Sequence, residues 1–467
     1  MSNTNKTLPA SRTHLAEPEA KTGSLGAFLS ELFRGFESEG IEYALARDYG
    51  ALPASLDSRD LDLFVGDGQL ERAYQVVKSV AQTHSSNVVR IDQESAMWLL
   101  VVYSDLSWAL RVDIATPDAR IWRGVCNLNL DRAFQRKVCE SGLYRLQAHD
   151  IVLMQFCRDI MGSFKLREKY RSAIRCVYIE NPRSFEAELG EMFGGRCAAA
   201  ISEVCREGIF EDLKVLGKQM RRAVIVRGLL REPLRTASNI LRYVGWRCRE
   251  YARPNGVMVV VMGPDGSGKG ALIEKVKQFV AGPLHFPARV YHWRPGLLPS
   301  LGSLLLGRDD EEGPVSNPHA KEPSGLIFSL LRLAYYTLDY VIGYWLLVRP
   351  YLGRKCIAAI FDRYYYDCLI DPVRYRISLP PWVVRAFAIV VPRPDLAILL
   401  SARPGVIYSR KPELPLGEIH RQCSEMGRLG GYIGNSVSIN TSKPLEDSAQ
   451  DMSRAILSTL EKRWKDR

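Results

Sequence analysis

A glycine-rich segment with one lysine is the part of the chain best suited to chemistry. It follows the apolar run Val257–Met262 and precedes a stretch with helical periodicity. The backbone N–H groups of such a loop, the positive end of the next helix and a lysine ammonium group favour binding of a nucleoside triphosphate. The residues expected to contact the nucleotide are Gly263, Asp265, Gly266, Ser267, Gly268, Lys269 and Gly270.

One position departs from the usual pattern of phosphate-binding loops. The pattern ends in Ser or Thr, whose hydroxyl group ligates Mg²⁺, and this chain has Gly270 there. A loop without this hydroxyl group is better suited to triphosphate binding than to efficient catalysis. An ordinary glycine-rich turn is the alternative interpretation of the segment.

A carboxylate and a guanidinium group follow a later apolar run. Residues 357–361 are typical of a buried strand, and Asp362 and Arg363 come directly after it. A carboxylate at the end of a parallel strand beside a phosphate-binding loop can hold Mg²⁺ or orient an attacking group. Arg363 is suited to bind the acceptor's phosphate through two hydrogen bonds. A surface ion pair is the alternative for these two residues.

The elements that position these residues follow an α/β pattern. Continuous apolar segments separated by helical stretches predict a parallel sheet that helices cover on both faces. We assign this sheet to a C-terminal domain over residues 254–467, after a boundary at Arg253-Pro-Asn-Gly. The predicted strands are 257–262, 289–293, 356–361, 396–400 and 436–440.

The C-terminal half resembles the thymidylate kinase family of nucleoside monophosphate kinases. The resemblance covers roughly residues 256–460 and implies a P-loop kinase fold that uses ATP and Mg²⁺, with a nucleotide or phosphorylated small molecule as substrate. It rests on Gly263-Pro-Asp-Gly-Ser-Gly-Lys269, Asp362-Arg363-Tyr364, residues 394–400 and Asn440-Thr-Ser-Lys-Pro444.

The resemblance also implies roles for individual residues. Asp265 would lie close to the acceptor sugar, Arg363 would contact the monophosphate, and Asp362 would hold Mg²⁺. Arg410 would be the basic residue that opens the lid, although by itself it is equally well read as a solvated charge. The implied catalytic residues are Lys269, Asp362, Arg363 and Arg410, and Thr441 and Lys443 would lie in the loop beside the adenine.

The arrangement of the whole chain resembles a bacterial group of proteins more closely. These carry a nucleotidyltransferase-like module before a thymidylate-kinase-like domain and are often associated with polysaccharide biosynthesis. Residues 290–295 and 361–367 are nearer to that group. However, Ser401, Arg403 and Gly405 stand where the family usually has Asp, Pro and Glu. A non-catalytic nucleotide-binding scaffold or regulator of polysaccharide assembly is therefore the alternative to a kinase.

Three acids in the N-terminal part define a second candidate site. Asp60 and Asp62 alternate on one predicted strand and so share a face, and Asp113 lies on another strand. Converging acids of this kind bind Mg²⁺ in nucleotidyl transfer, and residues 24–145 resemble the α+β nucleotidyltransferase fold. The Gly-Ser or Gly-Gly pair usual upstream is replaced by residues 47–50. Surface acids on an edge strand are the alternative.

Residues 146–253 form a helical connector with most of the excess positive charge. Between Lys214 and Arg253 there are eleven Lys or Arg against two Glu, in a chain of net charge +11. Apolar residues lie among the arginines, so a helical linker with solvated arginines and a helix pair on anionic lipid are both compatible with the pattern. No aromatic-interleaved reader motif accompanies the charge, so we expect no specific nucleic-acid partner.

The remaining features bear on location. Ten scattered cysteines without metal-ligand spacing fit a cytoplasmic protein. The basic connector raises peripheral contact with the inner membrane as the alternative location. Residues 1–23 are polar and are expected to form a disordered leader. The apolar stretch 326–348 contains Arg332 and Asp339, which favour a buried crossover helix over a membrane span. A second copy of the chain is a further candidate partner.

Overall fold

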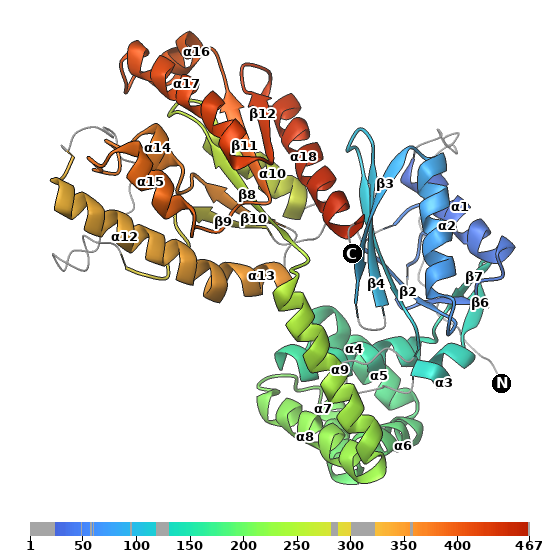
Figure 1. Cartoon of the computed structure of the whole chain (residues 1–467). Coiled ribbons are helices and arrows are strands. Elements are labelled where there is room, and N and C mark those ends of the chain that lie inside the picture. The colour runs from blue at the N-terminus through green and yellow to red at the C-terminus, as the bar shows by residue number, and fades with distance from the viewer. Residues whose placement is uncertain are drawn as a thin grey trace.

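The computed structural model contains two sheets and a helical region, arranged as Figure 1 shows. The predicted leader, residues 1–23, lies outside the described residues. The structure describes residues 24–47, 49–56, 58, 60–93, 96–117, 130–281, 288–299, 323–354 and 358–465.

The C-terminal sheet has five parallel strands in the order β12-β11-β8-β10-β9. All five predicted strands are confirmed, with ends within two residues of the expected positions. The α/β prediction for this half is therefore correct at the level of a parallel sheet. The strands are β8 (Val257–Met262), β9 (Arg289–His292), β10 (Ala358–Asp362), β11 (Leu396–Ser401) and β12 (Ser436–Asn440).

Helices cover both faces of this sheet, which explains why β8 is apolar along its whole length. Val257, Val259 and Val261 belong to one buried cluster with residues of α10 and α18, whereas Met258 and Val260 belong to another with residues of α12 and α17. The helices are α10 (Lys269–Ala281), α12 (Leu326–Gly343), η2 (Tyr344–Val348), α13 (Arg349–Arg354), α14 (Asp367–Ile370), α15 (Pro381–Ala388), α16 (Pro404–Arg410), α17 (Leu416–Ile433) and α18 (Leu445–Lys465).

The crossover helix α12 differs from its prediction. It does connect β9 to β10, but only about a third of its most apolar part is buried. Leu333 and Tyr340 face the core, and Asp339 is buried, whereas Ile327 and Leu331 are exposed. The expected crossover is present, but only the inner side of the helix is buried, because composition does not reveal which side of a helix meets the sheet.

The N-terminal sheet is mixed and has seven strands in the order β3-β4-β5-β2-β1-β7-β6. Helices α1 (Leu25–Ser38) and α2 (Leu70–Thr83) cover one face. The predicted acids lie on adjacent parallel strands, β2 and β5. The strands are β1 (Tyr43–Leu45), β2 (Asp60–Val65), β3 (Ser86–Asp92), β4 (Ala96–Tyr103), β5 (Ala109–Ala115), β6 (Val138–Glu140) and β7 (Leu143–Arg145).

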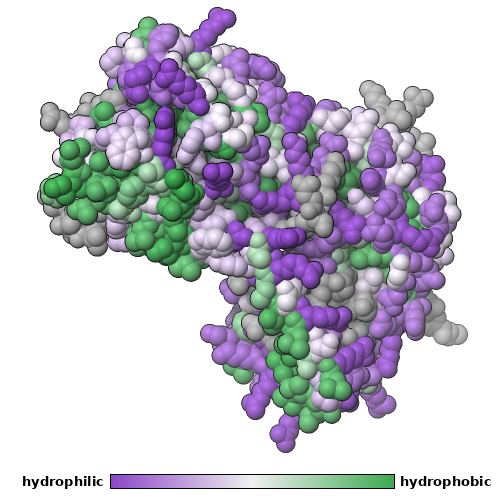
Figure 2. All heavy atoms as spheres, in the orientation of Figure 1, coloured by the Kyte–Doolittle hydropathy of each residue, from purple (hydrophilic) through white to green (hydrophobic). Residues whose placement is uncertain are grey.

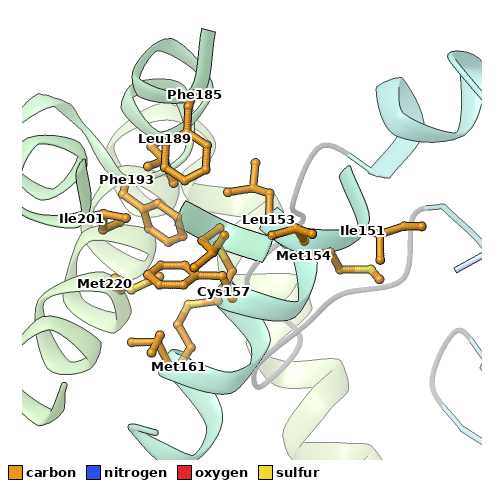
Figure 3. Close-up of a cluster of buried hydrophobic side chains, with 14 of the residues drawn as sticks. Ile151, Leu153, Met154, Cys157, Met161, Phe185, Leu189, Phe193, Ile201 and Met220 are labelled. Atoms are coloured by element: carbon orange, nitrogen blue, oxygen red, sulfur yellow. The ribbon is translucent and has the colours of Figure 1, made fainter. Parts of the chain in front are cut away.

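The helical region packs around one apolar cluster. Figure 3 shows Cys157, Phe185, Phe193 and Met220 of this cluster close together, contributed by three different helices. The last helix, α9, leads up to the C-terminal half (Figure 1). The helices are α3 (Leu130–Gln135), α4 (Ala148–Ser163), η1 (Glu168–Tyr170), α5 (Arg171–Glu180), α6 (Pro182–Phe193), α7 (Gly195–Glu207), α8 (Lys214–Arg231) and α9 (Pro233–Ala252).

The two sheets share a second apolar cluster. Val89 and Val102, on the face of the N-terminal sheet turned away from α1 and α2, join Leu457 and Leu460 of α18 and the valines of β8. In Figure 1, α18 stands between β3 and the C-terminal sheet. The two halves of the chain are thus packed together through buried side chains.

Candidate functional site

The candidate site lies where the parallel strands of the C-terminal sheet end. From β8 the chain passes to β9 and β10 on one side and later to β11 and β12 on the other. Ligands of open α/β sheets bind at the carboxyl ends of the strands where the strand order reverses in this way. The glycine-rich loop follows β8, and Asp362 ends the neighbouring strand β10.

The loop between β8 and α10 depends on two glycines. Gly266 has φ +85° and Gly268 has φ +87°, a region that disfavours residues with a side chain. A Cβ at Gly266 would also come within 2.8 Å of the carbonyl oxygen of Ile407 in α16. Helix α10 begins at Lys269, so its free N–H groups and its positive end lie at the loop.

Lys269 is a buried cation inside the loop. Its Nζ donates to the carbonyl oxygens of Gly263 at 2.5 Å and Pro264 at 2.9 Å, and lies 3.7 Å from Oδ1 of Asp265. Burial, with the nearby charge of Arg363, lowers the pKa of Lys269 to about 8. A phosphate anion at this point would restore the solvation that the ammonium group has lost.

Asp265 is the centre of an ion-pair cluster. Arg363 donates to its Oδ1 and Arg374 to its Oδ2. Burial opposes ionisation of this carboxyl group, but the charges of Arg363, Lys269 and Arg374 outweigh it and hold the pKa of Asp265 below its usual range. Sequence reasoning singled out Asp265 and Arg363 but missed Arg374, which lies in an irregular segment without a motif of its own.

Asp362 lies beside the loop and has one oxygen available. His292, at the end of β9, approaches its Oδ2 through Nδ1 at 3.4 Å. Burial works against the charged form, but His292, Lys269 and Arg363 lower the pKa of Asp362. Its Oδ1 and the Oγ of Ser267 are buried and have no hydrogen-bond partner among the described residues. Such atoms can accept a metal ion, its water or a phosphate oxygen.

Arg410 reaches the loop and Thr441 contacts Arg410, whereas Lys443 lies elsewhere. Arg410, at the end of α16, donates to the carbonyl oxygen of Thr441 at 2.9 Å, and its Nη1 lies 4.0 Å from where a Cβ of Gly268 would be. Lys443 instead lies 3.3 Å from Asp451 of α18 in an exposed ion pair. Of these three predicted residues, the structure therefore places Arg410 at the loop and Thr441 beside Arg410.

Aromatic residues line the side of the site next to β9. Trp293 adopts φ +65° and stacks on Tyr375 at 4.6 Å between ring centroids. The indole Nε1 of Trp293 and the hydroxyl group of Tyr375 are buried without a hydrogen-bond partner in the described part of the chain. Arg363 also has a positive φ, +74°. Strained non-glycine residues and unpaired polar atoms concentrate where proteins bind ligands.

Sequence reasoning did not assign roles to His292, Trp293 or Tyr375. His292 could have been found, because it ends a predicted strand in the same way as Asp362 ends its own. Tyr375 could not, since the segment that carries it has no regular pattern.

The N-terminal acids come together, but two arginines lie among them. Asp62 is opposite Asp113 in the β2–β5 pair. Arg111 binds Asp113 at 2.7 Å, and Arg47 lies 3.1 Å from Asp60 and also contacts Asp62. The pKa of Asp113 is raised to about 7, mainly because the carboxyl group is buried. The positive charge of Arg111 opposes this rise, and the negative charge of Asp62 contributes to it.

Metal binding by these three acids stays a prediction. Within the described ranges, no group of three or more His, Cys, Asp or Glu is arranged to hold a metal ion. A metal ion at Asp60, Asp62 and Asp113 would have to displace guanidinium groups that already neutralise them.

Comparisons with known proteins add little to this geometry. No protein-family model matches the chain, and no curated protein matches it in sequence. Among solved structures, the thymidylate kinase from Ehrlichia chaffeensis aligns at 12% identity and a TM-score of 0.29, over 44% of this chain and 100% of that one. A TM-score this low does not establish a shared fold, so a function can rest only on the contacts within the site.

Proposed function

We propose that the C-terminal half binds ATP at the glycine-rich loop and transfers a phosphoryl group to a nucleoside monophosphate or a related phosphorylated sugar. The observation that carries the proposal is the buried ammonium group of Lys269, enclosed by a loop with two positive-φ glycines at the start of α10. A desolvated cation, a helix N-terminus and a glycine-rich loop together favour a polyphosphate.

The acceptor would bind on the side of Arg363 and Arg374. Both guanidinium groups converge on Asp265, within reach of the loop and of Asp362. A phosphate there would form two-pronged hydrogen bonds with an arginine, and Asp265 would orient the arginines or the acceptor's sugar. Trp293 and Tyr375 offer a stacked aromatic surface for the remainder of the acceptor.

Mg²⁺ fits this site only in part. Asp362, whose Oδ1 has no hydrogen-bond partner among the residues that the structure describes, is suited to hold the ion directly or through water, and the ion would neutralise charge on the phosphates. The hydroxyl group usual at position 270 is absent, and Ser401 replaces an acid. These two losses favour the second candidate, a nucleotide-binding module without catalysis that regulates or scaffolds polysaccharide assembly.

The proposal extends to the rest of the chain. We assign a nucleotidyltransferase-like fold to the N-terminal sheet, because Asp60, Asp62 and Asp113 lie on two adjacent strands of a mixed sheet. The guanidinium groups of Arg47 and Arg111 among these acids favour a module that does not catalyse transfer. The proposed role in polysaccharide biosynthesis rests on the resemblance of the whole chain to the bacterial proteins that carry these two modules.

A phosphoryl-transfer assay tests the proposal. Purified protein is incubated with radiolabelled ATP, Mg²⁺ and a panel of nucleoside monophosphates and sugar phosphates. Transfer to one acceptor that Lys269→Ala abolishes would support the kinase. ATP binding without transfer to any acceptor would favour the non-catalytic module, and no ATP binding by folded protein would contradict both.

A further inference from the structure

One side of α12 carries a continuous row of exposed apolar residues. Ile327, Leu331, Leu338 and Trp345 follow one another at four- or seven-residue spacing, so they lie on the same side of the helix. Each is between 45% and 75% exposed. Helix α15 packs beside α12. We define the apolar face as these four residues together with Trp382 and Ile389, which are exposed in and next to α15.

The space-filling view places this apolar face on the outside of the molecule. Figure 2 shows hydrophobic surface gathered over α12, on the lobe that contains the C-terminal sheet. Isolated exposed apolar residues are common on soluble proteins, but a contiguous apolar surface marks a site of interaction.

The helix is long and apolar enough to cross a membrane by composition, but its contacts oppose this. The stretch Leu326–Gly353 has 28 residues, and its most apolar segment of 18 residues has a mean hydropathy of 1.3. On its inner side, however, buried Asp339 accepts hydrogen bonds from Arg294 at 3.1 Å and from the backbone of Leu298 at 2.8 Å. Crossing a bilayer would break these contacts, so the helix is suited to lie on a membrane surface.

Helix α9 meets the α12–α13 stretch at its C-terminal end and adds positive charge. Its end is tied to the α12–α13 stretch, since Arg349 donates to the carbonyl oxygen of Tyr251 at 2.7 Å and Tyr251 donates to that of Trp345 at 3.0 Å. Leu234 and Leu241 of α9 are exposed and seven residues apart. Helix α9 contains four Arg and one Glu.

The occupant that fits both properties is an anionic lipid surface. Arg235 and Arg242 are exposed and each directly follows one of the exposed leucines of α9. Apolar side chains can enter the acyl boundary while arginines meet lipid phosphates. A two-fold dimer through this surface would bring the arginines of both copies into one interface, where like charges repel.

We propose that α9 and the apolar face of α12 and α15 dock the protein reversibly on an anionic lipid bilayer. Tryptophans are typical of the boundary between headgroups and acyl chains, and Trp345 and Trp382 are both exposed. The proposal does not depend on the proposed phosphoryl transfer.

Vesicle co-sedimentation of the full chain tests the proposal. The probes are phosphatidylcholine vesicles with and without phosphatidylserine, at low and high salt. The variant Ile327→Glu/Leu331→Glu should lower partitioning to phosphatidylserine vesicles by at least about tenfold, because two exposed side chains that would enter the bilayer become charged. Both positions are exposed, so the variant should fold, which circular dichroism checks.

The matched control is Ile179→Glu. Ile179 of α5 is 61% exposed, the same fraction as Leu331, but lies in the helical region away from the apolar face. Its partitioning should equal that of the wild type. A third variant, Arg235→Glu/Arg242→Glu, should lose the preference for phosphatidylserine and most of the salt dependence.

Three results would overturn the proposal. The first is a wild-type protein that stays in solution with anionic vesicles at low salt, and the second is an Ile327→Glu/Leu331→Glu variant that binds them as well as the wild type. The third is a wild-type dimer, found by sedimentation velocity, that the same variant dissociates, since the apolar face would then be an interface between two copies.

Discussion

Arg363 donates to the carboxylate of Asp265 across the gap between the end of β10 and the loop after β8. The pair joins two neighbouring strands at the edge where the candidate site lies. Arg374 reaches the other oxygen of the same carboxylate, so one acid orients two arginines. A phosphate that binds there would find both guanidinium groups already in place, which lowers the entropy cost of binding.

We expect Asp265→Asn to remove a stabilising contribution that depends on pH. The folded-state pKa of Asp265 lies below the unfolded value of about 3.9. The contribution is therefore complete above this value and is lost as the pH falls below it towards the folded-state pKa. Breaking a buried pair costs about 3–5 kcal/mol, so the variant should be less stable by this order at pH 7.

Urea denaturation between pH 3 and 7 measures this difference. The gap in unfolding free energy between the wild type and Asp265→Asn should be constant above about pH 5 and should narrow below about pH 4. Asp92→Asn, which removes an exposed carboxylate on β3, serves as the control. A gap that widens in acid would contradict the assigned ion pairs.

We expect Lys269→Ala to lower the affinity for ATP by at least about tenfold, because each charge-assisted hydrogen bond contributes about 1.5–3 kcal/mol. Isothermal titration calorimetry measures the effect. Lys277→Ala is the control, since Lys277 lies on the same helix but points to Glu274 at the surface, 3.3 Å away. Equal ATP affinity in the wild type and Lys269→Ala would refute a phosphate site at this lysine.

We expect Gly270→Ser to increase the rate of phosphoryl transfer. We also expect this rate to depend more strongly on Mg²⁺ than in the wild type. The reason is that serine restores the hydroxyl ligand, and a Cβ at Gly270 meets no heavy atom within 4 Å. Gly270→Ala is the matched control, because alanine relieves the cost of about 1 kcal/mol that glycine imposes in a helix and serine relieves part of it.

Comparison of the two variants separates the hydroxyl group from the helix. A rate that rises with Ser but not with Ala supports a missing Mg²⁺ ligand. If neither variant is faster while both bind ATP, the site has adapted to glycine and the explanation of the departure at Gly270 is wrong.

We expect Arg47→Gln to raise the affinity of the N-terminal acids for divalent metal, because Arg47 now occupies the position beside Asp60 and Asp62. Titration with Mn²⁺, followed by electron paramagnetic resonance, measures the bound fraction. Arg90→Gln is the control, since Arg90 of β3 lies in the same sheet but pairs with Asp92 of β3 and Glu71 of α2 at the surface. If Arg47→Gln binds no more Mn²⁺ than the wild type, these acids are not a metal site.

The sequence predicted β8, β10 and β11 well because these central strands are buried on both faces. An uninterrupted apolar run such as Val257–Met262 has one interpretation when glycine and helical periodicity follow it. The polar residues at strand ends were found for the same reason, since the register of a parallel sheet places Asp362 beside the loop. The order of the strands determines where the residues at the strand ends lie, and this does not depend on the conformation of the surrounding loops.

Contacts between distant segments could not be predicted in the same way. Arg374 reaches Asp265 from a turn without periodicity, and Arg47 enters the acid cluster from the end of a three-residue strand. The exposure of the outer side of α12 was not predicted, because the presence of leucine and isoleucine in a helix does not reveal whether they face a core or a membrane surface. Only the packing of Asp339 and Leu333 shows which side is inner.

Val102 of β4 and Leu457 of α18 lie in the same buried cluster, although they come from opposite halves of the chain. A change of volume on one side must be matched on the other, so the two halves should diverge in concert during evolution. A gene fragment that encodes either half alone would leave an apolar sheet or helix face uncovered, and its product should aggregate. Neither half is therefore an exchangeable module.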